Sequence, residues 1–281
     1  MRADLHVHSN ASDGTDPPAE VMRRAALAGL DAVALTDHDT VAGHAQALRA
    51  LPDALTLVPG MELSCRLEGR SLHLLAYLFN PDAPELAAEL SRIRDDRVLR
   101  ARAMVERLAE LGARISWDQV AAIAGDAVVG RPHIARALAA SGVIAEPRDA
   151  FTPDWIADGG RAYVGRYALE PTRAIGLVRA AGGVVVLAHP RAGREWHVSD
   201  EQIARLAAVG LAGVEVFHPD QDEAERAGLL ALSHDLALLA SGGSDDHGSL
   251  TGHRIGAETA GPGVYAALVS AATWGKPLTG G

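Results

Sequence analysis

The sequence predicts an α/β barrel of seven strands, and three observations support this fold class. Seven short apolar segments recur along the chain, amphipathic stretches separate several of them, and 48% of the 281 residues are hydrophobic. Alternating strands and helices are typical of βαβ units. Buried parallel strands are expected at residues 5–8, 32–36, 55–59, 72–78, 184–188, 213–217 and 237–240. Seven units of this kind indicate a sheet that closes into a barrel.

Helices are expected after the first and the fifth of these strands. Residues 17–28 and 200–209 show the apolar spacing of amphipathic helices. Between the fourth and fifth strands, residues 82–168 have helical patterns and little strand character. The chain is therefore expected to form a barrel from residues 1–81 and 169–281, with a helical domain inserted at residues 82–168.

The expected insertion carries two helix signals. Its first helix has six arginines against three acidic residues, a local positive excess that is compatible with a solvated face or with a wall that faces an anion. A second helix is expected to begin in the segment Gly130-Arg131-Pro132-His133. Pro132 is expected at the first helical position, where its missing N–H costs nothing.

Composition excludes several classes of protein. The formal net charge of −10 argues against extended binding of duplex nucleic acid, which depends on broad Lys/Arg surfaces. No apolar run reaches the roughly 18 residues of a membrane helix, and His6 stands where a signal peptide needs apolar residues, so a cytoplasmic location is expected. Cys65 is the single cysteine, so any metal would be held by nitrogen and oxygen ligands.

Histidines and acidic residues follow or end most of the predicted strands. His6 and His8 end the first strand, and the alternation of a strand points both imidazoles to one face. The pattern then repeats at Asp13, Asp37, His38, Asp39, Glu62, His73, His189, Asp245, Asp246 and His247. Barrel enzymes build their sites at the carboxyl ends of strands, and buried charges need a partner or a metal. The sequence therefore predicts a metal centre at this end of the barrel.

Several of these segments resemble the motifs of the PHP (polymerase and histidinol phosphatase) family. They are His6-Val7-His8, Thr36-Asp37-His38-Asp39, Gly60-Met61-Glu62, Ala188-His189-Pro190 and Gly243-Ser244-Asp245-Asp246-His247. The resemblance implies a distorted seven-stranded (β/α)7 PHP barrel. Within the family, the segments 130–133 and 215–219 are similar to the branch of nucleoside 3′,5′-bisphosphate phosphatases and 5′-to-3′ exoribonucleases.

The resemblance also implies which residues bind metal ions. A first metal would be held by His6, His8, Glu62 and Asp245. Glu62 would bridge to a second metal held also by His73 and His189. A third metal would be held by Asp13, His38 and His247. Two or three divalent ions are thus expected, Mn²⁺ first, with Fe²⁺ or Zn²⁺ also compatible with mixed carboxylate and imidazole ligands.

The implied activity is a metal-dependent phosphoesterase. It would hydrolyse the 3′ phosphate ester of a 5′-phosphorylated nucleotide to 5′-nucleotide and phosphate, or trim short 5′-phosphorylated RNA. Arg131, His133 and His218 are the candidate substrate contacts, and His218 is also a candidate acid for the leaving group. Asp37 is a candidate catalytic-site residue that, with Asp39, would orient ligands or cap the following helix. The remaining histidines, at 44, 197, 234 and 253, are expected to be surface or core residues.

Three alternatives stay open at this stage. The first is a phosphatase for histidinol phosphate or another small phosphomonoester. The second is an amidohydrolase-type enzyme for C–N bonds, which usually bridges its metals with a carboxylated lysine, whereas Lys276 is the single lysine and lies near the C-terminus. The third is a PHP-like binding module without catalysis, which is disfavoured because every matched ligand position is intact.

Overall fold

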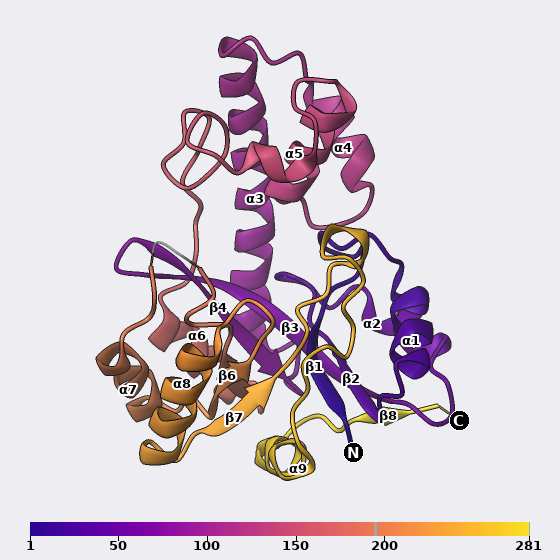
Figure 1. The fold of residues 1–281 in the computed structure, drawn as a ribbon, viewed down its shortest axis with the longest axis vertical. Coiled ribbons are helices and arrows are strands. Elements are labelled where there is room, and N and C mark those ends of the chain that lie inside the picture. The colour runs from indigo at the N-terminus through magenta and orange to yellow at the C-terminus, as the bar shows by residue number, and fades with distance from the viewer. Residues whose placement is uncertain (194–195, 281) are drawn as a thin grey trace. The chain divides into compact units, whose positions relative to one another are not determined.

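The structure, a computed structural model, describes residues 1–193 and 196–280. Seven strands form one sheet in chain order, and an eighth short strand pairs with β3. The strands are β1 (Ala3–Val7), β2 (Ala32–Leu35), β3 (Thr56–Leu67), β4 (Arg70–Tyr77), β5 (Val184–Leu187), β6 (Gly213–Phe217), β7 (Leu239–Gly242) and β8 (Leu278–Thr279). A bridge between Val7 and Asp246 brings the segment after β7 to β1 (Figure 1). The sheet is therefore nearly closed, which confirms the predicted seven-stranded barrel.

The direction of β4 differs from the expectation. The strands β1, β2 and β3 are parallel, as are β5, β6 and β7, but β4 runs antiparallel to both β3 and β5. The expectation of a parallel strand at residues 72–78 is therefore wrong. The reason is the connection: Glu68 and Gly69 have φ of 49° and 83°, and a two-residue turn with both φ positive makes a tight hairpin.

The strand β3 is long enough to pair with two different neighbours. Residues 56–59 pair with β2, and residues 60–67 pair with β4. Glu62 consequently lies inside β3, whereas the sequence pattern predicted that it follows a shorter strand. The N–H of Glu62 donates to the carbonyl of Thr36 at 3.0 Å, and the N–H of Asp39 donates to the carbonyl of Glu62 at 3.0 Å. These bonds hold Glu62 against the segment that follows β2.

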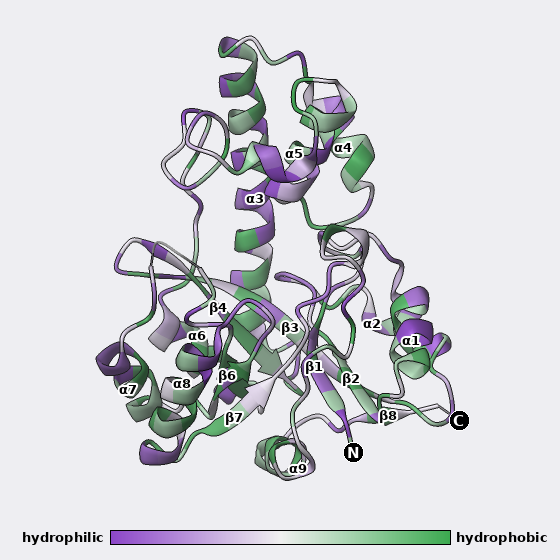
Figure 2. Cartoon of the chain, in the orientation of Figure 1, coloured by the Kyte–Doolittle hydropathy of each residue, from purple (hydrophilic) through white to green (hydrophobic). Residues whose placement is uncertain are grey.

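Helices surround the strands of the barrel (Figure 1). They are α1 (Pro18–Leu27), α2 (His44–Arg49), α6 (Pro171–Ala180), α7 (Asp200–Ala208), α8 (Glu223–Asp235) and α9 (Pro262–Ala271). Helix α7 begins with a capping box between Ser199 and Gln202, and α8 with one between Asp222 and Glu225. Helix α1 buries Met22, while polar residues colour its outer face in Figure 2. Such amphipathic helices cover the apolar strands and leave the strand ends for polar groups.

The chain divides into two compact units, of which the barrel is residues 1–87 and 168–281 and the second unit is Ala88–Tyr167. Helix α3 (Pro84–Glu110) leads into the second unit, which also contains α4 (Trp117–Ala124) and α5 (Arg131–Ala140). It has its own core, including Met104, Leu108, Val120, Ile134 and Leu138. Pro132 is the second residue of α5, one position later than expected. None of the described helices is long and apolar enough to span a bilayer.

Candidate metal centre

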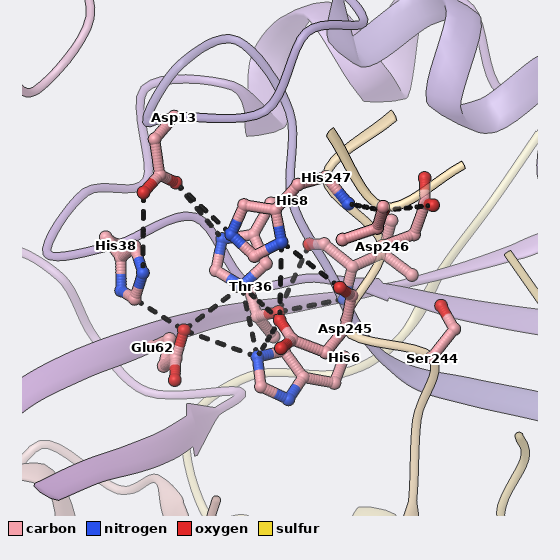
Figure 3. A network of polar contacts seen from close by, with 12 residues as sticks. His6, His8, Asp13, Thr36, His38, Glu62, Ser244, Asp245, Asp246 and His247 are labelled. Atoms are coloured by element: carbon pink, nitrogen blue, oxygen red, sulfur yellow. Dashed lines mark hydrogen bonds and ion pairs between the residues drawn. The ribbon is translucent and has the colours of Figure 1, made fainter. Parts of the chain in front are cut away.

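Two histidines at the end of β1 form the base of a cluster of imidazoles and carboxylates (Figure 3). His6 lies on β1 and His8 is the first residue after it, so their rings, two positions apart, share a face, and both are buried. Their Nε2 atoms lie 3.1 Å apart. The backbone of Gly243, the residue after β7, packs directly against His6. A Cβ atom on Gly243 would lie only 2.4 Å from the Cβ of His6. Only glycine allows this approach of the two segments.

Glu62 lies in the middle of the cluster, and one of its two carboxylate oxygens, Oε2, faces three imidazoles. Oε2 lies 3.3 Å from Nε2 of His6, 3.1 Å from Nε2 of His8 and 3.1 Å from Nδ1 of His38. The side chain of Glu62 is almost completely buried. A buried carboxylate oxygen surrounded by imidazole nitrogens is typical of a metal ligand.

The second oxygen of Glu62 faces a different pair of imidazoles. Oε1 lies 2.7 Å from Nδ1 of His73, on β4, and 3.1 Å from Nε2 of His189, which follows β5. The β3–β4 hairpin brings His73 here by pairing it with Ser64. A carboxylate whose two oxygens serve two sets of nitrogen donors has the arrangement of a bridging ligand, as in sites that hold two metals.

A third set of donors surrounds Asp13, in the loop after β1. Oδ1 of Asp13 lies 3.4 Å from Nε2 of His247, and Oδ2 lies 3.7 Å from Nε2 of His38. The ring of His247 stacks on that of His8, with centroids 4.0 Å apart. The loops after β1, β2 and β7 therefore meet at this carboxylate (Figure 3).

Asp245 completes the donors near β1. Its Oδ1 lies 3.3 Å from Nε2 of His6 and 3.3 Å from Nε2 of His8. Asp245 has φ of 48°, and His189 and Asp39 also have positive φ, of 25° and 56°. Residues other than glycine adopt this conformation rarely, and it is concentrated where the surrounding structure imposes it at functional sites.

Among the residues that the structure describes, three groups of ligand atoms lie close enough together to hold a metal ion each. They are His6, His8, Glu62 and Asp245; His8, Asp13, His38 and His247; and His38, Glu62 and His73. The first group is the set expected for the first metal, and the second contains the set expected for the third metal. In the last group His38 takes the place that the expectation gives to His189. His38 is thus a member of two groups, the one around Asp13 and the one that contains Glu62 and His73.

Several candidate ligand atoms are buried without a hydrogen-bond partner, as expected of atoms that bind a cation. Within the described part of the chain, His8 Nδ1, Asp13 Oδ1, His38 Nδ1 and Asp245 Oδ1 are buried without a hydrogen-bond partner. Several of them nevertheless lie within 3.5 Å of an opposite donor or acceptor. Nitrogen and carboxylate atoms that converge without hydrogen-bond geometry are satisfied by a shared divalent cation.

The pKa values show how strongly the cluster is charged. Burial disfavours ionisation of Glu62, yet the pKa of this carboxyl lies well below its usual value because of neighbouring imidazoles, first that of His38. Burial likewise opposes charge on His6, but the carboxylates of Glu215 and Asp245 raise its pKa well above the usual value. The carboxylates thus favour positive charge among these groups, and a bound divalent cation would supply it in place of protons on the imidazoles.

The sequence analysis gave no role to Glu215, which lies on β6 directly behind His6. Its Oε1 accepts a hydrogen bond from Nδ1 of His6 at 3.1 Å, and its Oε2 accepts one from the N–H of His189 at 2.8 Å. A proton on Nδ1 leaves the Nε2 lone pair of His6 directed into the cluster. Glu215 therefore fixes the tautomer of one candidate ligand and the backbone of another.

Asp37 and Asp39 lie behind the candidate ligands, and neither caps a helix. Both oxygens of Asp37 are used by the loop after β1: they accept hydrogen bonds from the N–H and hydroxyl of Ser9 and from the hydroxyl of Ser12, at 2.7–2.8 Å. Asp39 accepts a hydrogen bond from the N–H of Ser64 at 2.7 Å. Asp37 thus holds the loop that carries Asp13.

His218, after β6, lies at the side of the cluster. The N–H of Asp220 donates to its Nδ1 at 3.1 Å, so the proton of the neutral ring is on Nε2, which lies 3.3 Å from Oδ2 of Asp245. Arg254 also approaches Oδ2 of Asp245, at 3.7 Å, and pairs with Asp220 at 3.2 Å. Arg254 is a second residue that the sequence patterns did not single out.

The other two candidate substrate contacts belong to the second unit, where both have structural partners. Arg131 pairs with Asp158 at 2.6 Å and donates to the carbonyl of Ile156 at 3.2 Å. His133 is buried, and its Nδ1 accepts a hydrogen bond from the N–H of Gly130 at the start of α5. The structure brings neither residue into the groups of metal ligands, and their contact with substrate stays a prediction.

The histidines without a motif lie apart from the cluster. His44 is partly buried, and its Nε2 donates to the carbonyls of Gly60 and Leu35, at 2.8 and 3.2 Å. His197 and His234 are exposed, and His253 lies 3.5 Å from Asp16 at the surface.

The chain is similar to several known proteins. A model of the PHP domain matches residues 4–113. A 5′-3′ exoribonuclease of Haemophilus influenzae is 32% identical over 249 residues, which cover 87% of this chain and 89% of that protein. A 3′,5′-nucleoside bisphosphate phosphatase of Chromobacterium violaceum is 33% identical over 256 residues and 89% of each chain. A solved structure from Bifidobacterium adolescentis, assigned as a metal-dependent phosphoesterase, has a TM-score of 0.90 at 33% identity over 96% of both chains.

The fold and the site together define a metal-dependent hydrolase of phosphate esters. The chain belongs to the PHP family, because it matches the model of the PHP domain and shares more than 30% identity with these relatives over most of its length. The predicted resemblance is thereby confirmed. Among the described residues, Glu62 and not a lysine lies between the imidazoles, so the amidohydrolase alternative lacks its usual bridging group.

Proposed function

We propose that this enzyme hydrolyses the 3′ phosphate ester of 5′-phosphorylated nucleotides, releasing phosphate from a 3′,5′-bisphosphate or a nucleotide from short 5′-phosphorylated RNA. The observation that carries the proposal is the division of Glu62 between two sets of imidazoles. Two relatives that align over most of the chain carry names for these two reactions. Both reactions break a phosphate ester at the 3′ oxygen, so one site can serve both.

We further propose that the three groups of ligands hold two or three divalent cations, with Mn²⁺ as the first candidate. Mixed carboxylate and imidazole donors suit Mn²⁺, Fe²⁺ and Zn²⁺. When bound, such ions lower the pKa of a water molecule and neutralise the phosphate oxygens. The Nε2–H of His218 faces the outer oxygen of Asp245 and keeps that carboxylate in place. Glu215 does the same for the imidazole of His6.

Within this proposal the part of the substrate that does not react is also held by residues outside the metal centre. Arginine recognises phosphate through two parallel hydrogen bonds, and Arg131 and His133 are the residues proposed for the phosphate that is not cleaved. His218 is proposed to lie beside the reacting phosphate, because the N–H of Asp220 and the carboxylate of Asp245 fix the orientation of its ring.

The test is turnover of three substrates by protein loaded with Mn²⁺. Adenosine 3′,5′-bisphosphate should give 5′-AMP and phosphate, and a short 5′-phosphorylated RNA should lose nucleotides from its 5′ end. Histidinol phosphate serves as the substrate of the alternative phosphatase. Hydrolysis of histidinol phosphate with no reaction of the two nucleotide substrates would reject the proposed substrate and leave the phosphoesterase class intact.

A further inference from the structure

A small cavity lies beside the pair of imidazoles that faces Oε1 of Glu62. Its volume is about 150 Å³, and both His73 and His189 line it. The remaining walls come from β4 and from the loop after β5, and they include Leu72, Pro190, Trp196 and Val198. The cavity therefore shares two side chains with the candidate metal centre.

The size and lining of this cavity select one kind of occupant. A cavity of about 150 Å³ has room for one flat aromatic group, whereas a drug-sized ligand needs roughly 300 Å³ or more. Among the described residues that line it, none is Asp, Glu, Lys or Arg. These described side chains offer no positive charge of an arginine or lysine to a phosphate group. A flat, uncharged ring with polar atoms at its edge would find apolar walls, an indole and two imidazoles.

The loop that carries Trp196 is tied to the barrel at both ends. The N–H of Val198 donates to the carbonyl of Pro190 at 3.0 Å, which closes the loop. At its start, the N–H of Arg191 donates to Oε1 of Gln221 at 3.0 Å. Gln221 in turn donates to the carbonyl of Val216, on β6, at 2.9 Å. The described residues at the two ends of this loop are thus held to the barrel.

We propose that this cavity binds the nucleobase of the substrate, stacked on the indole of Trp196, while the phosphate ester lies at the metal centre. The proposal rests on the function proposed above. His73 and His189 belong to both sites, so a ring in the cavity and a phosphate at the ligands are parts of one molecule. Stacking on an aromatic side chain tolerates any base, so the enzyme is specific for nucleotides as a class and not for one base.

Two substrates test this assignment. One is adenosine 3′,5′-bisphosphate, and the other is methyl riboside 3,5-bisphosphate, which has the same phosphates and no base. Trp196→Ala should lower kcat/KM for the nucleotide about ten- to a hundredfold, the range expected from the loss of one base stack. The same variant should leave kcat/KM for the riboside unchanged, which also shows that the protein is folded. Trp196→Phe should retain most of the activity on the nucleotide, because a phenyl ring also stacks.

Trp274 provides the matched control. Its indole is 56% exposed and lines a different cavity, together with Leu78 and Lys276. Trp274→Ala should leave kcat/KM for both substrates unchanged. Binding of 5′-AMP to the Mn²⁺-loaded enzyme should quench tryptophan fluorescence in the wild type and in Trp274→Phe, and the quenching should be lost in Trp196→Phe.

Three results would overturn the assignment: equal loss of activity on both substrates in Trp196→Ala, no loss on either, or quenching by 5′-AMP that persists in Trp196→Phe. Failure of the proposed function looks different. A wild-type enzyme that shows Trp196-dependent quenching by 5′-AMP but does not hydrolyse the bisphosphate would contradict the proposed reaction and support the cavity as a base-binding site.

Discussion

Nε2 of His218 lies 3.3 Å from Oδ2 of Asp245, while Oδ1 of the same carboxylate points to His6 and His8. The side chain of Asp245 therefore has an inner oxygen for the cluster and an outer oxygen for its support. Arg254 is the second group near the outer oxygen, at 3.7 Å. An acid held in this way is restricted to binding through one oxygen.

His218→Ala should weaken metal binding because it removes the donor to Asp245. Loss of a group that supports a metal ligand typically costs about 10–100-fold in metal affinity or activity. Titration against a chelating dye should show this loss, and excess Mn²⁺ should restore part of kcat. His234→Ala is the control, because the side chain of His234 is 90% exposed. A fall of kcat with unchanged metal content would instead identify His218 as the acid for the leaving group.

Glu215→Gln should disturb His6 without changing the volume of the side chain. The carboxylate accepts from Nδ1 of His6 and from the N–H of His189, and an amide can satisfy only one of them with its single oxygen. We expect about a 10–100-fold loss of Mn²⁺ affinity, measured by calorimetry. Glu225→Gln, in the capping box of α8, is a matched substitution that should leave Mn²⁺ affinity at the wild-type value. Equal affinities of Glu215→Gln and wild type would exclude the assigned role.

Removal of the metals should abolish activity and lower stability. His6→Ala and Asp245→Ala each remove a donor from the group that also contains His8 and Glu62, so turnover should fall to background while circular dichroism stays that of a folded protein. Stripping the wild type with a chelator should have the same effect, and Mn²⁺ should reverse it. At a hundredfold excess over its Kd, a bound ion adds about 2.7 kcal/mol to the free energy of unfolding. Full activity of the stripped protein would refute a catalytic metal centre.

Much of the barrel was predictable because buried strands are short apolar runs with clear limits. The predicted direction and length of a strand were wrong where strand pairing depends on turns and on the choice of partner, and not on apolar character alone. The direction of β4 is set by the turn at Glu68 and Gly69, and the length of β3 is set by its change of partner after Pro59. β8, with two residues, has no periodicity to detect.

Most candidate ligands could be predicted because they are charged or imidazole side chains in or near an apolar run, whereas Asp13 follows in the next polar turn. Glu215 was missed for a physical reason. It belongs to β6, and a single acid inside a strand has the same local pattern as a half-exposed strand. A usable signal existed, because its neighbours Val214 and Val216 are apolar as well, so Glu215 interrupts a continuous buried run. The exact division of His38 and His189 between groups depends on distances that no sequence pattern contains.

His44 should make stability depend on pH below neutrality. Burial lowers the pKa of this imidazole in the folded protein, more than its hydrogen bonds to Gly60 and Leu35 raise it. As pH falls below about 6.5, the unfolded chain therefore takes up a proton before the folded one, and stability decreases by up to about 1.4 kcal/mol per pH unit. His44→Gln keeps a donor for Gly60 and does not titrate. Urea unfolding at pH 7.5 and 5.5 should show a larger loss for wild type than for His44→Gln, and equal losses would refute this assignment.

Gly243→Ala should separate the end of β7 from β1. The added methyl carbon would lie 2.4 Å from the Cβ and 2.6 Å from the backbone nitrogen of His6, and backbone atoms cannot yield as a flexible side chain does. Overpacking of this kind costs about 1–3 kcal/mol, and the displaced strand end would also move Asp245 away from its partners. We expect a lower free energy of unfolding in urea and weaker Mn²⁺ binding in the same variant.

Gly176→Ala, on α6, is the control. Its methyl group would meet no neighbouring group within 4 Å, and alanine should stabilise that helix by about 1 kcal/mol. Loss of stability in Gly243→Ala with unchanged Mn²⁺ affinity would show that the contact with His6 supports the barrel alone and does not position the metal ligands.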